Sequence, residues 1–164
     1  MTIRYETAQP GDEPVLWEML TYAASMDGDR PDAIERAQRD PGLSAYVRGF
    51  GRDGDLGLVA RDGLEAVGAA WLRLWDGAPV AYKVATATEP ELAIGIRPTH
   101  RGSGVGTALL EQLLAEADGR YSAVVLSVRE HNPSRRLYER MGFREVSRVV
   151  NRVGGASLVM RRAR

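Results

Sequence analysis

The turn Arg101-Gly-Ser-Gly-Val-Gly106 combines residue types that could bind a phosphate. Its three glycines let a ligand approach the backbone without a Cβ in the way. A helix is predicted to begin at Gly104, and a helix start offers unpaired N–H groups and the positive end of the helix dipole. The pattern predicts an anion site with Arg101 as a cation at its edge, whereas glycine content alone fits a turn without a ligand equally well.

Two common phosphate-binding motifs do not fit this turn. A Walker loop requires Lys followed by Ser or Thr after its last glycine, and here Gly106 is followed by Thr107. A dinucleotide fingerprint requires Gly or Ala at its sixth position, which is Thr107 or Leu109 in the two possible registers. A P-loop nucleotide hydrolase and a Rossmann dinucleotide site are therefore not predicted.

A second segment, Asn132 to Phe143, has the signals of a short helix that carries a phenol. Asn132 and Pro133 are typical of a helix cap and of the first helical position. Gly142 is a natural end. Tyr138 would lie inside this helix, either as an aromatic side chain of the core or as a proton donor.

Together the two segments resemble the GNAT superfamily of N-acetyltransferases. Arg101, Gly104 and Gly106 match the acetyl-CoA pattern of that family, Arg/Gln-x-x-Gly-x-Gly/Ala. The later segment is similar to the family pattern N-x-x-x-x-(x)-L-Y-x-x-x-G-F, with Asn132 and Tyr138 at its shorter spacing. Two motifs in the right order are far more specific than either one alone.

The resemblance implies one GNAT-like domain over residues 1–164, with the acetyl-CoA motif at 92–119 and the second motif at 131–143. The implied fold class is α/β (α+β). It consists of a single mixed, mostly antiparallel sheet with a splayed central strand pair, flanked by helices. The N-terminal half matches the family in the order of its elements.

The resemblance also implies how acetyl-CoA is held. The pantetheine arm would pair with the strand before the turn, as an added strand would, and the turn would surround the pyrophosphate with N–H groups. The implied cofactor-binding residues are Ile94, Gly95, Ile96, Arg101, Gly102, Ser103, Gly104, Val105, Gly106, Thr107, Asn132, Arg135 and Tyr138. Without the motif, Gly95 fits a packing glycine equally well.

The implied reaction moves the acetyl group of acetyl-CoA directly to a primary amine of a small molecule or peptide, in a ternary complex. The amine must lose a proton and the leaving thiolate must gain one. Tyr138 is the expected acid, and Glu91 is the expected base, acting through water. Glu91 also fits a solvated residue after Pro90, and Glu89 is a lesser rival. The alternative function is a non-catalytic acyl-CoA-binding sensor or regulatory domain.

Hydrophobic periodicity predicts the elements that must position these residues. Strands are expected at 3–7, 56–61, 66–75, 92–96, 123–128, 143–150 and 157–160. Helices are expected from 11–12 to 23, at 31–39, at 104–119 and from 132–133 to 142. A hairpin at 62–63, a turn at 40–42, a loop at 76–90 and a disordered tail at 161–164 complete the prediction.

Composition excludes several classes of function. The 22 basic and 22 acidic residues among 164 give no net charge, which argues against a nucleic-acid partner. No apolar run is long enough for a membrane span and no secretory stretch begins the chain, so we expect a cytoplasmic protein with no membrane partner.

The composition also bears on metals and partners. The chain has no cysteine, and His100 and His131 lack metal-ligand spacing, so no metal is expected. Acceptor contacts are expected from the variable stretches at 22–50 and 75–90, whose sequence does not identify the acceptor. A homodimer is expected by resemblance only.

Overall fold

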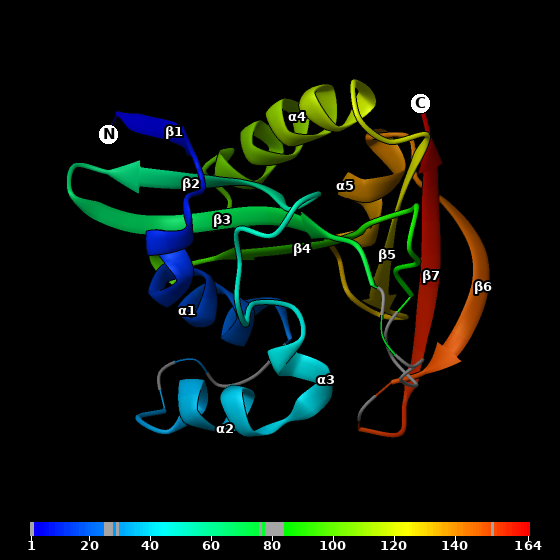
Figure 1. Cartoon of the computed structure of the whole chain (residues 1–164), viewed down its shortest axis with the longest axis horizontal. Coiled ribbons are helices and arrows are strands. Elements are labelled where there is room, and N and C mark those ends of the chain that lie inside the picture. The colour runs from blue at the N-terminus through cyan, green and yellow to red at the C-terminus, as the bar shows by residue number, and fades with distance from the viewer. Residues whose placement is uncertain (1, 25–27, 29, 76, 78–83, 152) are drawn as a thin grey trace. The chain divides into compact units, whose positions relative to one another are not determined.

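The computed structural model describes residues 2–24, 28, 30–75, 77, 84–151 and 153–164. Figure 1 shows helices and strands mixed along the chain. The strands are β1 (Ile3–Thr7), β2 (Leu56–Asp62), β3 (Glu65–Arg73), β4 (Glu91–Ile96), β5 (Ala123–Arg129), β6 (Arg144–Val150) and β7 (Ala156–Ala163). The helices are α1 (Glu13–Ala23), α2 (Ala33–Arg39), α3 (Pro41–Ser44), α4 (Val105–Asp118) and α5 (Arg135–Arg140). Short 3-10 helices occupy Pro10–Asp12 and Pro98–His100.

The seven strands form one hydrogen-bonded sheet in the order β1-β2-β3-β4-β5-β7-β6. The pairs β1–β2, β2–β3, β5–β7 and β6–β7 are antiparallel. Strands β4 and β5 are parallel, with Glu91 opposite Val125 at the beginning of β4. The expected mixed, mostly antiparallel sheet flanked by helices is therefore confirmed, and the expected strands are all present.

The chain forms two compact units. One consists of Met1–Leu72 with Ala93–Leu113, and the other consists of Arg73–Leu92 with Leu114–Arg164. Strand β4 and helix α4 each contribute residues to both units, and each unit is described by itself below.

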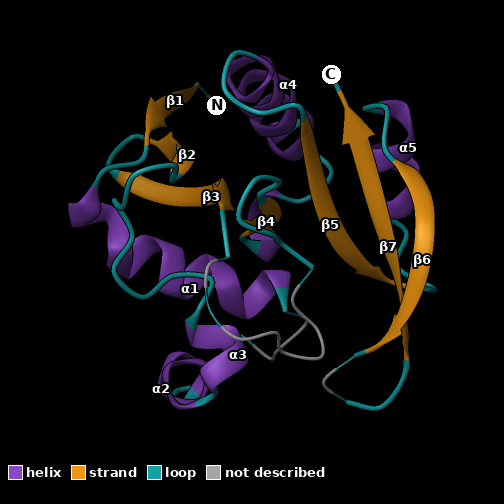
Figure 2. Ribbon diagram, turned by 45° about the vertical axis from the view of Figure 1, so that its right-hand side comes forward, coloured by secondary structure: helices purple, strands orange, loops and turns teal. Residues whose placement is uncertain are grey.

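The first unit is built on β1, β2 and β3, with α1 on one side of these strands and the beginning of α4 on the other (Figures 1 and 2). The amphipathic helix α1 buries Leu16, Met19 and Leu20 in an apolar cluster. That cluster also contains the fully buried Trp71 of β3, whose Nε1 donates to the Tyr46 carbonyl at 2.8 Å. The buried indole therefore keeps a hydrogen bond, as a buried donor requires.

Strand β4 meets α1 at a glycine. A Cβ on Gly95 would lie 2.1 Å from the carbonyl oxygen of Met19 and 2.8 Å from its carbonyl carbon. Both atoms belong to the helix backbone, so neither can rotate away. Packing therefore requires a glycine at position 95, because only an absent side chain lets the backbone of α1 lie this close to β4.

The second unit shows that the expected disordered tail is wrong. Strand β7 pairs with β5 as far as Ala163 and with β6 from Arg161 to Ala156. Arg161 binds both oxygens of Glu89 at 2.9 Å, and Arg162 binds Asp118 at 2.7 and 3.1 Å. The ladder and these two paired arginines hold the segment that composition alone suggested would be loose.

Two local predictions are also corrected. Residues 40–42 begin the short helix α3 instead of forming a simple turn, because the Asp40 carboxylate accepts hydrogen bonds from the N–H groups of Gly42 and Leu43. Helix α5 begins at Arg135 instead of Pro133. Asn132 closes a turn first, since its side-chain oxygen accepts from Ser134 N–H at 2.8 Å.

The contact at Gly95 predicts the effect of one added methyl group. Gly95→Ala must push β4 and α1 apart, so we expect it to lower the free energy of unfolding by about 3 kcal/mol or more. The control is Gly11→Ala, because a Cβ at exposed Gly11 meets nothing within 4 Å. Urea unfolding measures both, and a Gly95→Ala variant as stable as Gly11→Ala would contradict the close approach.

Candidate functional site

The predicted phosphate turn joins β4 to α4 within the first unit. After the 3-10 helix Pro98–His100, the chain passes Gly102 and Gly104 with φ angles of 72° and 87°. These left-handed values favour glycine strongly. Ala108 N–H then donates to the Gly104 carbonyl at 3.0 Å. The N–H groups of residues 105–107 precede this first α-helical bond, so the turn presents them at the start of α4.

The space around the turn distinguishes the third glycine from the other two. A Cβ on Gly106 would lie 3.9 Å from the nearest atoms of Ile94 and Ile96, which is ordinary contact, and its φ is not in the left-handed region. Neither backbone conformation nor packing therefore requires a glycine at position 106. Access of a ligand to the helix start would require one.

The side chain of Arg101 folds back along the end of β4. Its Nε donates to the Ile96 carbonyl at 3.3 Å, and its guanidinium carbon lies 5.8 Å from the ring centroid of Tyr22 on α1. This contact is a cation–π interaction. The main chain of Ile96 was predicted to pair with pantetheine, and its carbonyl accepts a hydrogen bond from Arg101 in this structure.

Sequence reasoning missed a second arginine beside the turn. Arg97 follows β4, and its backbone N–H donates to the Val67 carbonyl at 2.8 Å. Its guanidinium donates two hydrogen bonds, of 2.7 and 3.0 Å, to the carboxylate of Glu18 on α1. These bonds raise the pKa of Arg97. The bidentate geometry fixes α1 against the end of β4. No local pattern could have found this pair, because 79 positions separate its members.

His100, to which no chemistry was assigned, also braces the turn. Its Nε2 lies 3.0 Å from Asp62 Oδ2 and its Nδ1 lies 2.8 Å from Thr99 Oγ1. The Ser103 hydroxyl donates to the His100 carbonyl. The histidine therefore connects the turn to the tip of the β2–β3 hairpin, and its contacts are structural.

The second motif lies in the other unit, where Tyr138 is buried on α5. Its ring centroid is 6.1 Å from that of Phe143, edge to face, and only 9% of the residue is exposed. Burial raises the pKa of Tyr138 to about 12, because the phenolate would lose its hydration. The phenol is protonated at neutral pH at this value as at its ordinary pKa, as a proton donor must be.

Glu91 is not a solvated residue. It is buried at the start of β4, and its Oε1 accepts the N–H groups of Val84 and Ala85 at 3.0 and 3.3 Å. Its former rival Glu89 is bound by Arg161, whose hydrogen bonds lower the pKa of the Glu89 carboxyl. A lowered pKa makes Glu89 a weaker base than an ordinary glutamate.

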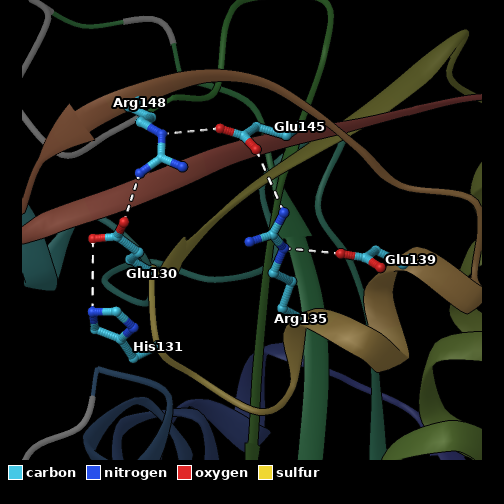
Figure 3. Close-up of polar contacts among 6 residues, drawn as sticks. All are labelled: Glu130, His131, Arg135, Glu139, Glu145 and Arg148. Atoms are coloured by element: carbon cyan, nitrogen blue, oxygen red, sulfur yellow. Dashed lines mark hydrogen bonds and ion pairs between the residues drawn. The ribbon is translucent and has the colours of Figure 1, made fainter.

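Arg135 is held by two carboxylates in the same unit (Figure 3). Its Nε donates to Glu139 at 2.8 Å, and its Nη2 lies 3.5 Å from Glu145. The predicted contact of Arg135 with a cofactor phosphate would compete with these pairs. Asn132 is occupied in a similar way by the turn onto Ser134.

The structure groups the predicted residues by unit. The strand residues Ile94, Gly95 and Ile96 lie in the first unit with the turn 101–107. Glu91, Asn132, Arg135 and Tyr138 lie in the second. Among the described residues, no group of three or more His, Asp or Glu side chains is placed to hold a metal ion. In the same residues, no helix is both long and apolar enough to cross a membrane.

Comparison with known proteins covers most of the chain. A family model described as Acetyltransferase (GNAT) family matches residues 16–143. A mycothiol acetyltransferase from Parafrankia sp. (strain EAN1pec) is 40% identical over 88 residues, which is 51% of this chain and 24% of that protein. The match thus spans about a quarter of the length of that relative.

Solved structures share the fold. The structure of yncA from Salmonella typhimurium, determined with its cofactor acetyl-CoA, has a TM-score of 0.72 and 20% identity and covers 99% of this chain and 94% of that chain. The ribosomal-protein-S18-alanine N-acetyltransferase from Escherichia coli has a TM-score of 0.67 and 18% identity, again covering 99% and 94%. At these identities the likeness concerns the fold.

The raised pKa of Tyr138 predicts how stability depends on alkaline pH. Between its ordinary pKa near 10 and the folded value of about 12, the unfolded chain loses the phenol proton first, so stability falls as pH rises. The loss should reach about 2 kcal/mol near pH 12. Tyr138→Phe should remove this contribution, so its stability should fall less steeply in urea unfolding between pH 9 and 11.5. Parallel curves for the two proteins would contradict the burial of the phenol.

Proposed function

Since the chain belongs to the acetyltransferase (GNAT) family, we propose that it transfers the acetyl group of acetyl-CoA directly to a primary amine of a small molecule or a peptide. The amine nitrogen attacks the thioester carbonyl carbon in a ternary complex, the C–S bond breaks, and the products are an acetamide and free CoA. The chain has no cysteine, so a cysteine acyl-enzyme is excluded.

The observation that carries this proposal is Gly106. The fold has room for a side chain there and the backbone does not need a glycine, yet Gly106 lies one residue after the first residue of α4. A pyrophosphate could approach the N–H groups of residues 102–107 closely only if position 106 has no Cβ. We therefore propose that this turn binds the pyrophosphate of acetyl-CoA, with Ile94, Gly95 and Ile96 along the pantetheine arm.

Two restrictions on the cofactor contacts follow from the geometry of the first unit. Gly95 is already explained by its contact with Met19, so its part in binding pantetheine rests on its main chain alone. The Ile96 carbonyl must exchange the Arg101 guanidinium for pantetheine if it pairs with the cofactor. The Arg101 guanidinium would then lose this hydrogen bond, and it would become a candidate cation for the pyrophosphate.

Tyr138 is the proposed general acid. When the C–S bond breaks, the sulfur becomes a thiolate that needs a proton, and a phenol that remains protonated at neutral pH can supply it. Asn132 and Arg135 remain proposed cofactor contacts by motif, and both would first have to leave the partners described above.

Glu91 is the proposed base. It would take the proton of the attacking amine through a water molecule. The hydrogen bonds from Val84 and Ala85 hold its carboxylate against the stretch 75–90, where acceptor contacts are expected. Much of that stretch, residues 76 and 78–83, lies outside the described residues. The single domain and the homodimer rest on the family resemblance, and the cytoplasmic location rests on the composition. All three stay predictions.

Release of free thiol from acetyl-CoA tests the proposed function. The names of the relatives suggest a panel of amines: an amino sugar related to mycothiol, a peptide with an N-terminal alanine, amino acids and a polyamine. We expect thiol release that depends on both acetyl-CoA and at least one amine, at a turnover on the order of 1 s⁻¹ or faster. Binding of acetyl-CoA in calorimetry without release on any amine would favour the sensor over the enzyme.

The role of Tyr138 makes a separate prediction. Tyr138→Phe keeps the buried ring and removes only the hydroxyl, so we expect unchanged acetyl-CoA affinity and a kcat lower by about 10²–10⁴-fold. Tyr5→Phe in β1 makes the same change outside both motifs and should keep the wild-type kcat. Steady-state kinetics and calorimetry on the three proteins measure this, and a Tyr138→Phe variant with wild-type kcat would exclude the acid role.

A further inference from the structure

A chain of ion pairs links helix α5 to strand β6 in the second unit (Figure 3). Arg148 donates to Glu130 at 2.7 Å and to Glu145 Oε1 at 3.1 Å. The other oxygen of Glu145 lies 3.5 Å from Arg135, which also donates to Glu139 at 2.8 Å. The single carboxylate of Glu145 therefore bridges two guanidinium groups.

These pairs connect three separate segments. Glu130 lies in the loop after β5, Arg135 is the first residue of α5, and Glu145 and Arg148 belong to β6. The loop after β5 leads directly into α5. The ion pairs thus hold the beginning of α5 and the loop before it to the same strand.

The register shows which face of β6 carries the charges. Glu145 is opposite Met160 and Arg148 is opposite Leu158, and both β7 partners are almost fully buried. Cross-strand partners lie on the same face of a sheet. The face of β6 beside this apolar surface therefore carries a glutamate and an arginine. Helix α5 contacts this face of β6 through an ion pair instead of through apolar side chains alone.

Helix α5 depends on such anchors because it has only six residues. A helix this short does not persist without tertiary contacts. Its C-terminal end is fixed by Arg162, whose Nε donates to the Met141 carbonyl at 3.0 Å. Its N-terminal end is fixed by Arg135. Tyr138 lies between these two anchors, and its buried ring packs edge to face on Phe143.

We propose that Glu145 is a positioning residue: by bridging Arg135 and Arg148 it fixes the rotation of α5 and so directs the hydroxyl of Tyr138 at the reacting sulfur. This inference rests on the proposed role of Tyr138 as the acid. The side chains of Glu145 and Arg148 are 33% and 53% exposed, so water screens their attraction and the pairs contribute little to global stability. Orientation is a different matter, because a misplacement of about 1 Å can cost 10²-fold in rate.

The test replaces the bridging carboxylate by an amide of the same size. Glu145→Gln should lower kcat by about 10-fold, with little change in Tm or in the affinity for acetyl-CoA. The control is Glu6→Gln, since Glu6 also bridges two arginines, Arg4 at 3.4 Å and Arg61 at 3.0 Å, in the other unit. Glu6→Gln should keep the wild-type kcat, and a loss equal to that of Glu145→Gln would overturn the proposal.

Two further readouts separate positioning from general damage. In the double variant Glu145→Gln/Tyr138→Phe, the first change should have no further effect on kcat, because the group that it positions is gone. At saturating acetyl-CoA, raising the salt concentration from about 0.05 to 0.5 M should lower the wild-type kcat and leave that of Glu145→Gln almost constant. Independent, multiplied losses in the double variant would overturn the proposal.

The outcomes distinguish this proposal from the one on which it rests. If Tyr138→Phe keeps the wild-type kcat, the acid role fails, and the positioning role fails with it. If Tyr138→Phe loses kcat while Glu145→Gln does not, only the positioning role is overturned. Arg148→Gln, which breaks the pairs with both Glu130 and Glu145, should reproduce the loss in Glu145→Gln and guards against an effect peculiar to position 145.

Discussion

The candidate cofactor turn depends on one close contact, the backbone of α1 lying on β4 at Gly95. The Met19 carbonyl oxygen lies 2.1 Å from where a Cβ would be, so the two backbones are already in close contact at this point. Arg97 and Arg101 extend the contact by binding Glu18 and Tyr22 of the same helix. These contacts fix the end of β4, and they therefore also position the turn that leads into α4.

The glycines of this region serve different physical ends. Position 95 needs a glycine for packing, and positions 102 and 104 need one for their left-handed backbone. Of these four glycines, only Gly106 is required neither by packing nor by its backbone conformation. That contrast is the reason to expect a ligand at the start of α4. It predicts that the absence of a Cβ at position 106 serves ligand binding.

Much of the fold could be predicted from the sequence, because its signals are local. Alternating strands and the hairpin at Gly63 appear as expected, and Tyr138 lies on the expected short helix. What could not be predicted depends on residues far apart. Neither the pairing of Arg161 with Glu89, which orders the tail, nor the burial of Glu91 leaves a trace in neighbouring positions.

The central claim, that the turn 102–107 binds the pyrophosphate, is tested most directly by calorimetric titration of acetyl-CoA into the wild type, Gly106→Ala and Gly11→Ala. We expect Gly106→Ala to keep its Tm within about 2 °C and to bind at least about 10-fold more weakly, which corresponds to about 1.4 kcal/mol. Gly11→Ala should bind as the wild type does. Wild-type affinity in a folded Gly106→Ala variant would contradict the claim.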